Sequence, residues 1–221
     1  MIQTVSPGVS RFARRDASGW TVDMIVVDLG DGALVYSPTS FGEQTKALVE
    51  QVGAPRVLVA PNHYHHLSLG KFGALWPSAM KVTSDGARPR LENKGHTELR
   101  ALSDAKLPAH VRLLPAPGTK NGETWLMVDD TLVVCDSFFH VTDPITGVMG
   151  MIHRGLRTTP GLQLSRTFAW VGVKDRAEYR SWVLETLERE KPKVLAFSHG
   201  TPVRDADAWK RCVELVDRYL G

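Results

Sequence analysis

Three short apolar runs in this sequence each lead into side chains of the kind that bind metal ions. The runs and the polar residues that follow them are 57–60 with His63 and His65, 132–135 with Asp136, and 194–197 with His199. Apolar runs of this length are typical of buried strands. In layered α/β folds, sites form at the edge where strands end. The three runs therefore favour a fold whose buried strands end at one edge, and we expect one site there.

The stretch Asn-His-Tyr-His-His-Leu-Ser-Leu-Gly at residues 62–70 holds three of the eight histidines of the chain. Imidazole is a common ligand of zinc and iron. In an extended backbone, residues i and i+2 point to the same side, so His63 and His65 can face one ion, while His66 should point to the opposite side. The stretch therefore predicts a metal site with His63 and His65 among its ligands.

Composition excludes several classes of protein. The 221 residues are 43% hydrophobic and 23% charged, as in ordinary globular proteins, and the length suffices for one substantial core. We expect a single domain over residues 1–221. The formal net charge is +3 and the basic residues are spread along the chain, so nucleic-acid binding is not predicted.

Neither a membrane span nor a secretory leader is predicted. No apolar run approaches the ~18 residues that cross a bilayer, and the first residues lack a basic segment followed by an apolar one. A cytoplasmic protein without membrane partners is expected. Cys135 and Cys212 lack the short spacing of a zinc knuckle or a redox pair, and a disulfide between them stays open.

Hydrophobic periodicity predicts strands and helices at both ends of the chain around a β-rich centre. The predicted elements are a hairpin over 20–36, a helix over 41–52, strands at 57–60, 79–84, 111–114, 123–128 and 131–135, a helix over 175–190, a strand at 194–198 and a helix over 206–220. Segment 88–104 is expected to lie on the surface. Segment 138–167 is expected to be a long loop or short broken helices, because glycine and proline interrupt it.

The order of these features resembles the metallo-β-lactamase fold superfamily. Its members usually carry T-H-x-H-x-D-H followed by glycine, then P-G-H, an aspartate after a strand, and a late histidine. His63 and His65 match the first two signature histidines, and Gly70 matches the glycine. Asp136 matches the bridging aspartate and His199 the late histidine. The resemblance implies a four-layer αββα sandwich with these two histidines, Asp136 and His199 as metal ligands at one edge of the β layers.

The sequence departs from that signature at three positions. Leu67 replaces the aspartate, Ser68 the third histidine, and Thr119 the histidine expected after Pro-Gly. Most of the missing ligands belong to the second metal site of the signature. The pattern is most similar to a branch of the superfamily described only as domains of unknown function, and it implies one zinc or iron ion, or a vestigial site without metal.

Three functions remain open. The first is a metal-dependent hydrolase acting on a small polar substrate. Since Leu67 cannot accept a proton, His199 or His66 would be its general base. The second is a non-catalytic, metal-free relative whose polar residues bond one another and whose cleft binds a small ligand or a partner. The third is a mononuclear iron oxygenase, because two histidines and one carboxylate also suit iron.

Further polar residues follow Asp136 in the irregular segment. His140, Asp143 and His153 can reach back over the site, or they can be exposed loop residues. The sequence leaves the identity of the substrate and the oligomeric state open.

Overall fold

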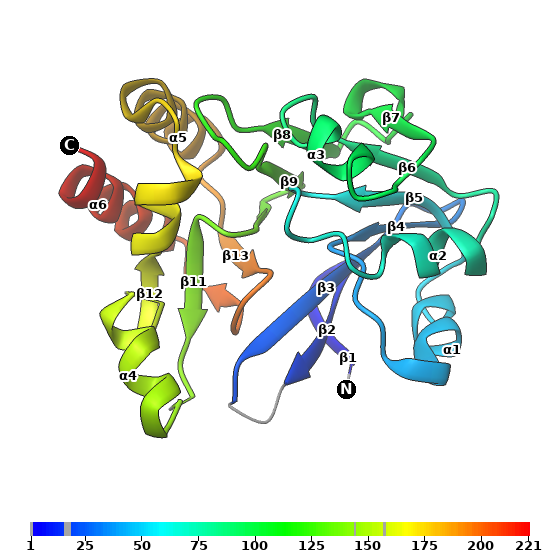
Figure 1. The fold of residues 1–221 in the computed structure, drawn as a ribbon, viewed down its shortest axis with the longest axis horizontal. Coiled ribbons are helices and arrows are strands. Elements are labelled where there is room, and N and C mark those ends of the chain that lie inside the picture. Colours follow the sequence, from blue (N-terminus) through cyan, green and yellow to red (C-terminus); the bar gives the residue numbers. More distant parts are fainter. Residues whose placement is uncertain (1, 16–18, 144, 157) are drawn as a thin grey trace.

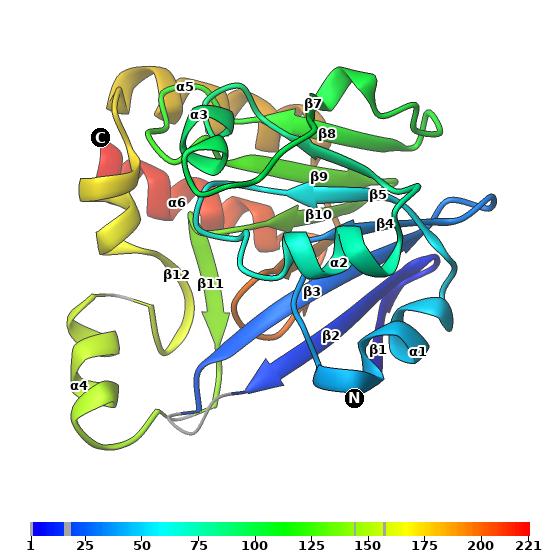
Figure 2. The ribbon, with the colours of Figure 1, turned by 45° about the vertical axis from the view of Figure 1, so that its right-hand side comes forward.

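The computed structural model describes residues 2–15, 19–143, 145–156 and 158–221. Within them, two β-sheets pack face to face, and helices cover the outer face of each sheet (Figures 1 and 2). This confirms the predicted four-layer αββα sandwich.

The first sheet has seven strands among the described residues, hydrogen-bonded in chain order. They are β1 (Ile2–Ser6), β2 (Val9–Arg15), β3 (Thr21–Asp28), β4 (Ala33–Tyr36), β5 (Pro55–Ala60), β6 (Met80–Thr83) and β7 (Leu99–Ala101). Strands β1 to β4 pair antiparallel, and β4 to β7 pair parallel. Parallel neighbours need a crossover, and helices supply it. These helices are α1 (Thr45–Glu50), which follows a 3₁₀ turn at Gly42–Gln44, α2 (Leu69–Leu75) and α3 (Arg88–Glu92).

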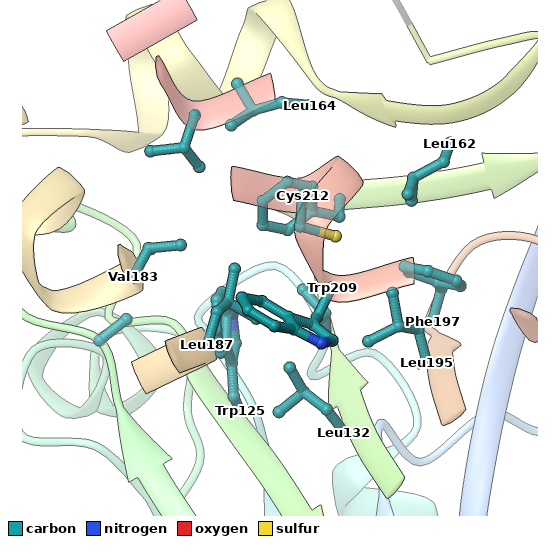
Figure 3. Close-up of a cluster of buried hydrophobic side chains, with 14 of the residues drawn as sticks. Trp125, Leu132, Leu162, Leu164, Val183, Leu187, Leu195, Phe197, Trp209 and Cys212 are labelled. Carbon is teal, nitrogen blue, oxygen red and sulfur yellow. The ribbon is translucent and has the colours of Figure 1, made fainter. Parts of the chain in front are cut away.

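The second sheet has five strands among the described residues, in the order β14-β13-β10-β9-β8. Their bounds are β8 (Val111–Pro115), β9 (Thr124–Val128), β10 (Thr131–Val134), β13 (Val194–Phe197) and β14 (Val203–Arg204). Helices α5 (Arg176–Glu190) and α6 (Ala208–Leu220) cover its outer face. Figure 3 shows Trp125 and Leu132 of the sheet against Leu187 and Trp209 of these helices. No helix in the described ranges is long and apolar enough to cross a bilayer.

Strand β3 explains why the buried runs are continuously apolar. Met24 and Val26 pack under the helices of the first sheet, while Ile25 and Val27 belong to the core between the two sheets. Successive side chains of a strand point to opposite faces. Because both faces of this sheet are covered, both sets of positions must be apolar.

Both cysteines are buried free thiols in this arrangement. Cys135 lies in the core between the sheets, and Cys212 is a residue of α6 that packs against the second sheet. Burial raises the pKa of Cys135 well above its usual value and that of Cys212 to about 12. The two thiols are therefore unreactive packing residues.

Three regions differ from the sequence prediction. Strands β1 and β2 were not predicted, and segment 88–104 contains α3, β7 and a 3₁₀ turn (Leu102–Asp104) instead of surface loop alone. The segment expected as a loop forms β11 (Phe138–Val141), α4 (Gly147–Gly155) and β12 (Gly161–Leu164), followed by a π-helix at Phe168–Gly172. β11 and β12 pair antiparallel across α4, which is a non-local pairing that local patterns do not reveal. Figure 1 shows α4 and this hairpin extending beside the sandwich.

Candidate metal centre

Three strand ends meet at one edge of the sandwich. His65 follows β5, Asp136 follows β10, and His199 follows β13. Val134 of β10 is aligned with Phe197 of the parallel neighbour β13. Asp136 and His199 each lie two residues beyond this pair, so the register of the sheet places them side by side. The convergence predicted from the three apolar runs is thereby confirmed for these three residues.

The donor atoms of this group have the spacing of metal ligands. The Nε2 atom of His65 lies 3.1 Å from Oδ1 of Asp136 and 3.2 Å from Nε2 of His199. Oδ1 of Asp136 and Nε2 of His199 are 3.3 Å apart. Zinc bonds of 2.0–2.1 Å in tetrahedral geometry place neighbouring ligand atoms about 3.3 Å apart. These three atoms can therefore occupy one face of a tetrahedron around a zinc ion.

Hydrogen bonds to the opposite ring nitrogens hold the two histidines in place. Nδ1 of His199 lies 2.8 Å from the carbonyl oxygen of Thr21, to which it donates. Nδ1 of His65 lies 2.8 Å from the hydroxyl of Ser37. Such contacts orient metal-binding imidazoles in proteins. Both rings consequently present Nε2 to the carboxylate of Asp136.

The side chain of Asn62 connects two parts of the donor group. Its Nδ2 donates to Oδ2 of Asp136 over 2.8 Å, which leaves Oδ1 facing the histidines. Its Oδ1 accepts from the backbone nitrogens of Tyr64 and His65 at 2.8 and 3.1 Å. Asn62 therefore positions the carboxylate and the backbone of one histidine at once.

A buried carboxylate, Glu123, supports the Asp136 segment from behind. It accepts hydrogen bonds from the backbone nitrogens of Asp136 and Ser137, from the Ser137 hydroxyl, and from Nε1 of Trp125. Burial, and next the charge of Asp136, raise the pKa of Glu123 to about 7, although the hydrogen bonds from Ser137 and Trp125 oppose this shift. No local pattern in the sequence indicates this role of Glu123, since it depends on contacts across the second sheet.

Electrostatics at the donor group favour a bound cation. Burial alone would raise the pKa of Asp136, but the charges of His65 and His199 and their hydrogen bonds lower it well below its usual value. Burial also opposes the charged form of His65, yet the Asp136 carboxylate outweighs it and raises the pKa of His65. The group therefore stabilises positive charge at this point, which either a proton or a metal ion can supply.

Whole-structure comparison finds full-length matches among metallo-β-lactamases. The DIM-1 metallo-β-lactamase matches with a TM-score of 0.68 at 11% identity, over 99% of this chain and 97% of that one. The FIM-1 enzyme from Pseudomonas aeruginosa, in its mono-zinc form, matches with a TM-score of 0.63 at 12% identity, over 100% and 96%. The metallo-β-lactamase from Erythrobacter litoralis, with β-mercaptoethanol in its active site, matches with a TM-score of 0.67 at 13% identity, over 98% and 96%.

The chain has the metallo-β-lactamase fold. No family model matches the sequence, and no curated protein sequence matches it either. Identities this low establish the fold alone.

His63 lies outside the donor group, in contrast to the sequence prediction. Its Nδ1 is 3.1 Å from the backbone carbonyl oxygen of Asn121, and Nη1 of Arg90 is 3.2 Å from its Nε2. Burial, together with the charges of Arg90 and Lys94, lowers the pKa of His63. The prediction assumed extended backbone, but the chain bends directly after β5 and turns through residues 65–68. The i, i+2 relation between the two histidines therefore does not hold.

Neither histidine proposed as a general base presents an unengaged ring nitrogen among the described residues. His66 contacts Nε2 of His96 at 2.8 Å and Nζ of Lys94 at 3.0 Å. Burial, and next the charge of Lys94, lower its pKa to about 4. His199 uses one nitrogen for Thr21 and the other in the donor group. The sequence did not identify His96 or Lys94 as partners of His66.

The three positions that depart from the metallo-β-lactamase signature have other surroundings. Leu67 is 86% exposed. The hydroxyl of Ser68 accepts from the backbone nitrogen of Ser40, and the hydroxyl of Thr119 donates to the carbonyl of Ala116. None of these three side chains belongs to the donor group found in the described residues.

Of the three polar residues considered after Asp136, only His153 lies at the site. His153 lines the cavity beside the donor group, and its ring stacks on Trp20 with 4.4 Å between centroids. Nδ1 of His140 instead lies 2.8 Å from the carbonyl oxygen of Thr201. Asp143 forms an exposed ion pair with Arg15.

A zinc ion held by the donor group would bind about 10- to 100-fold more weakly after replacement of Asn62 by alanine, the usual effect of removing a residue that orients a ligand. The variant loses the hydrogen bond to Asp136 and both bonds to the backbone of residues 64 and 65. Competition with a fluorescent chelator measures the affinity. Asn93→Ala, at an exposed asparagine after α3, is the matched control. Equal zinc affinity in a folded Asn62→Ala protein would contradict this role.

Proposed function

We propose that this protein is a hydrolase that uses one metal ion held by His65, Asp136 and His199. The observation that carries the proposal is the separation of 3.1–3.3 Å among the three donor atoms, with the rings and the carboxylate oriented by further hydrogen bonds. Three protein ligands leave one position of a tetrahedral ion open, as in catalytic zinc sites. The mono-zinc form of the similar FIM-1 enzyme supports zinc as the metal.

A zinc ion bound here would polarise a carbonyl group and lower the pKa of a bound water toward ~7. The residues of the chain orient the ligands, and two aromatic rings pack against the ring of His199. The ring of Trp20 lies 4.8 Å from that of His199, and the ring of Phe139 stacks on His199 at 5.1 Å. In the proposed hydrolysis, a water oxygen bonds to the carbonyl carbon, the bond from that carbon to the leaving group breaks, and one O–H bond of the water breaks as its proton passes to the leaving group.

Zinc-loaded protein is expected to hydrolyse 4-nitrophenyl butanoate, and removal of the metal with a chelator is expected to reduce the rate to that of the uncatalysed reaction. Added zinc should restore it. His199→Asn is expected to be inactive, because it loses the nitrogen of the donor group. Asparagine is chosen because its amide can still donate to the Thr21 carbonyl. Release of 4-nitrophenol measures the rate, and circular dichroism confirms that the variant folds.

The outcomes separate the remaining functions. Protein that stays metal-free in the presence of zinc or iron would refute the proposal and favour a hydrogen-bonded polar cluster with a binding role. Iron binding with oxygen consumption and no hydrolysis would favour the oxygenase, because two histidines and a carboxylate also suit iron. Zinc binding without hydrolysis of any ester or amide tested would contradict the hydrolase.

A further inference from the structure

A cavity of about 320 Å³ lies beside the donor group. His65, Asp136 and His199 are among the residues that line it. The largest apolar side chains in its walls are Trp20, Phe139, Leu156, Phe168 and Val171. Ligand cavities of this size are usually apolar with a few polar groups that fix orientation. The walls therefore suit a ligand whose larger part is apolar.

Apolar side chains line the cavity both beside the donor group and at the protein surface. The ring of Trp20 lies 4.8 Å from that of His199 and 5.6 Å from that of Phe139. At the outer end, Leu156 and Val171 line the cavity and are also 37% and 54% exposed. An apolar chain that starts at the donor group would cover these two side chains as it leaves the cavity, which removes apolar surface from water.

One polar side chain in the wall lacks a partner. Asn121 is 1% exposed, and neither Nδ2 nor Oδ1 of its amide has a hydrogen-bond partner among the described residues. Asn121 also lines the cavity. Buried amides are nearly always hydrogen-bonded. Both amide atoms of Asn121 are buried in the wall, so the side chain must turn toward the cavity to meet a ligand group. Its Nδ2 can donate to a carbonyl oxygen.

We propose that the cavity binds esters or amides of aliphatic carboxylic acids with a medium-length acyl chain. The carbonyl group lies between Asn121 and the donor group, and the acyl chain runs along Phe139 and Phe168 toward Val171. This proposal deepens the proposed function and rests on it for the position of the bond that is broken. The sequence predicts a small polar substrate. The ligand proposed here is largely apolar instead, because the cavity walls include apolar residues from β11, the π-helix and the end of α4.

Methyl ketones test this proposal, since they carry the carbonyl and the chain but no hydrolysable bond. Titration calorimetry of the full chain with 2-pentanone, 2-heptanone and 2-nonanone is expected to show affinity rising about fourfold for each added methylene, the effect of burying one such group. The titrations are made with zinc present and after chelation. Affinity that does not rise with chain length would overturn the proposal.

Two variants and a control locate the binding site. Val171→Asp is expected to weaken 2-nonanone more than 2-pentanone, because only the longer chain reaches the cavity mouth. Asn121→Leu is expected to weaken all three ketones by the same factor. Val148→Asp, at a 66% exposed position of α4 outside the cavity wall, is the matched control and should bind like the unchanged protein. An equal loss in Val148→Asp and Val171→Asp would overturn the proposed location.

The experiment distinguishes this proposal from the proposed function. Chain-length dependence in a protein that never binds metal would refute the hydrolase while supporting acyl recognition by the cavity. Zinc-dependent hydrolysis without chain-length dependence would refute the acyl site alone.

Discussion

Replacing His65 or His199 by asparagine is expected to abolish stoichiometric zinc binding, whereas His63→Asn is expected to bind one zinc ion per chain like the unchanged protein. The first two substitutions remove a nitrogen from the donor group, while His63 lies outside it. Elemental analysis after dialysis against zinc measures the stoichiometry, and competition with a chelator measures the affinity.

Asparagine is the matched replacement at all three positions, because its amide nitrogen lies about where Nδ1 of histidine lies. The hydrogen bonds of the three Nδ1 atoms with Ser37, Thr21 and the Asn121 carbonyl can therefore persist. Loss of zinc in His63→Asn together with retention in His65→Asn would show that the metal lies elsewhere.

Zinc binding at this site is also expected to weaken in acid. Asp136 raises the pKa of His65, so the metal must displace a proton from that ring as pH falls through the raised value. Below it, the affinity should fall about tenfold per pH unit for each displaced proton.

Arg11→Met is expected to lower the free energy of unfolding by about 3–5 kcal/mol at pH 8, the usual cost of breaking a buried ion pair. Nε and Nη2 of Arg11 both lie 2.8 Å from Oδ2 of Asp23, and the two residues are 7% and 0% exposed. Asp23 also accepts from the backbone nitrogen of Gly200, next to the donor group. The variant leaves a buried carboxylate without its cation.

The loss should be smaller at pH 5.5. Burial, only partly opposed by Arg11, raises the pKa of Asp23 to about 7, from 3.8 in a model compound. The folded state therefore binds more protons than the unfolded state between about pH 4 and 7, and this group's contribution to stability falls as pH rises through that range. Without Arg11 the pKa of Asp23 rises further. The variant therefore loses stability only at pH values where Asp23 is ionised in the unchanged protein.

Urea unfolding at both pH values measures this difference. Arg11→Met/Asp23→Asn removes both charges and keeps an acceptor for Gly200, so it should recover most of the stability at pH 8. An identical loss at pH 5.5 and pH 8 in Arg11→Met would contradict the assignment of the pH dependence to Asp23.

Local patterns in the sequence predict much of the sandwich. The hairpin of β3 and β4, the strands β5, β10 and β13, and helices α5 and α6 lie where periodicity places them. Helix α5 also begins at a recognisable cap, since the side chain of Asp175 accepts from the backbone nitrogen of Glu178. The hairpin of β11 and β12 escapes prediction because its two short strands pair across a helix.

By itself, the sequence determined the buried strands and the positions of Asp136 and His199 beyond two of them, because strand periodicity and parallel register are local and regular properties. Only the tertiary structure decided which histidine joins them. Beyond the end of β5 the chain bends, and contacts with Ser37 and Asn62 orient His65 toward the donor group. Contacts with Asn121 and Arg90 hold His63 away from that group. The cavity, likewise, exists only where β11, the π-helix and the end of α4 meet the sandwich edge.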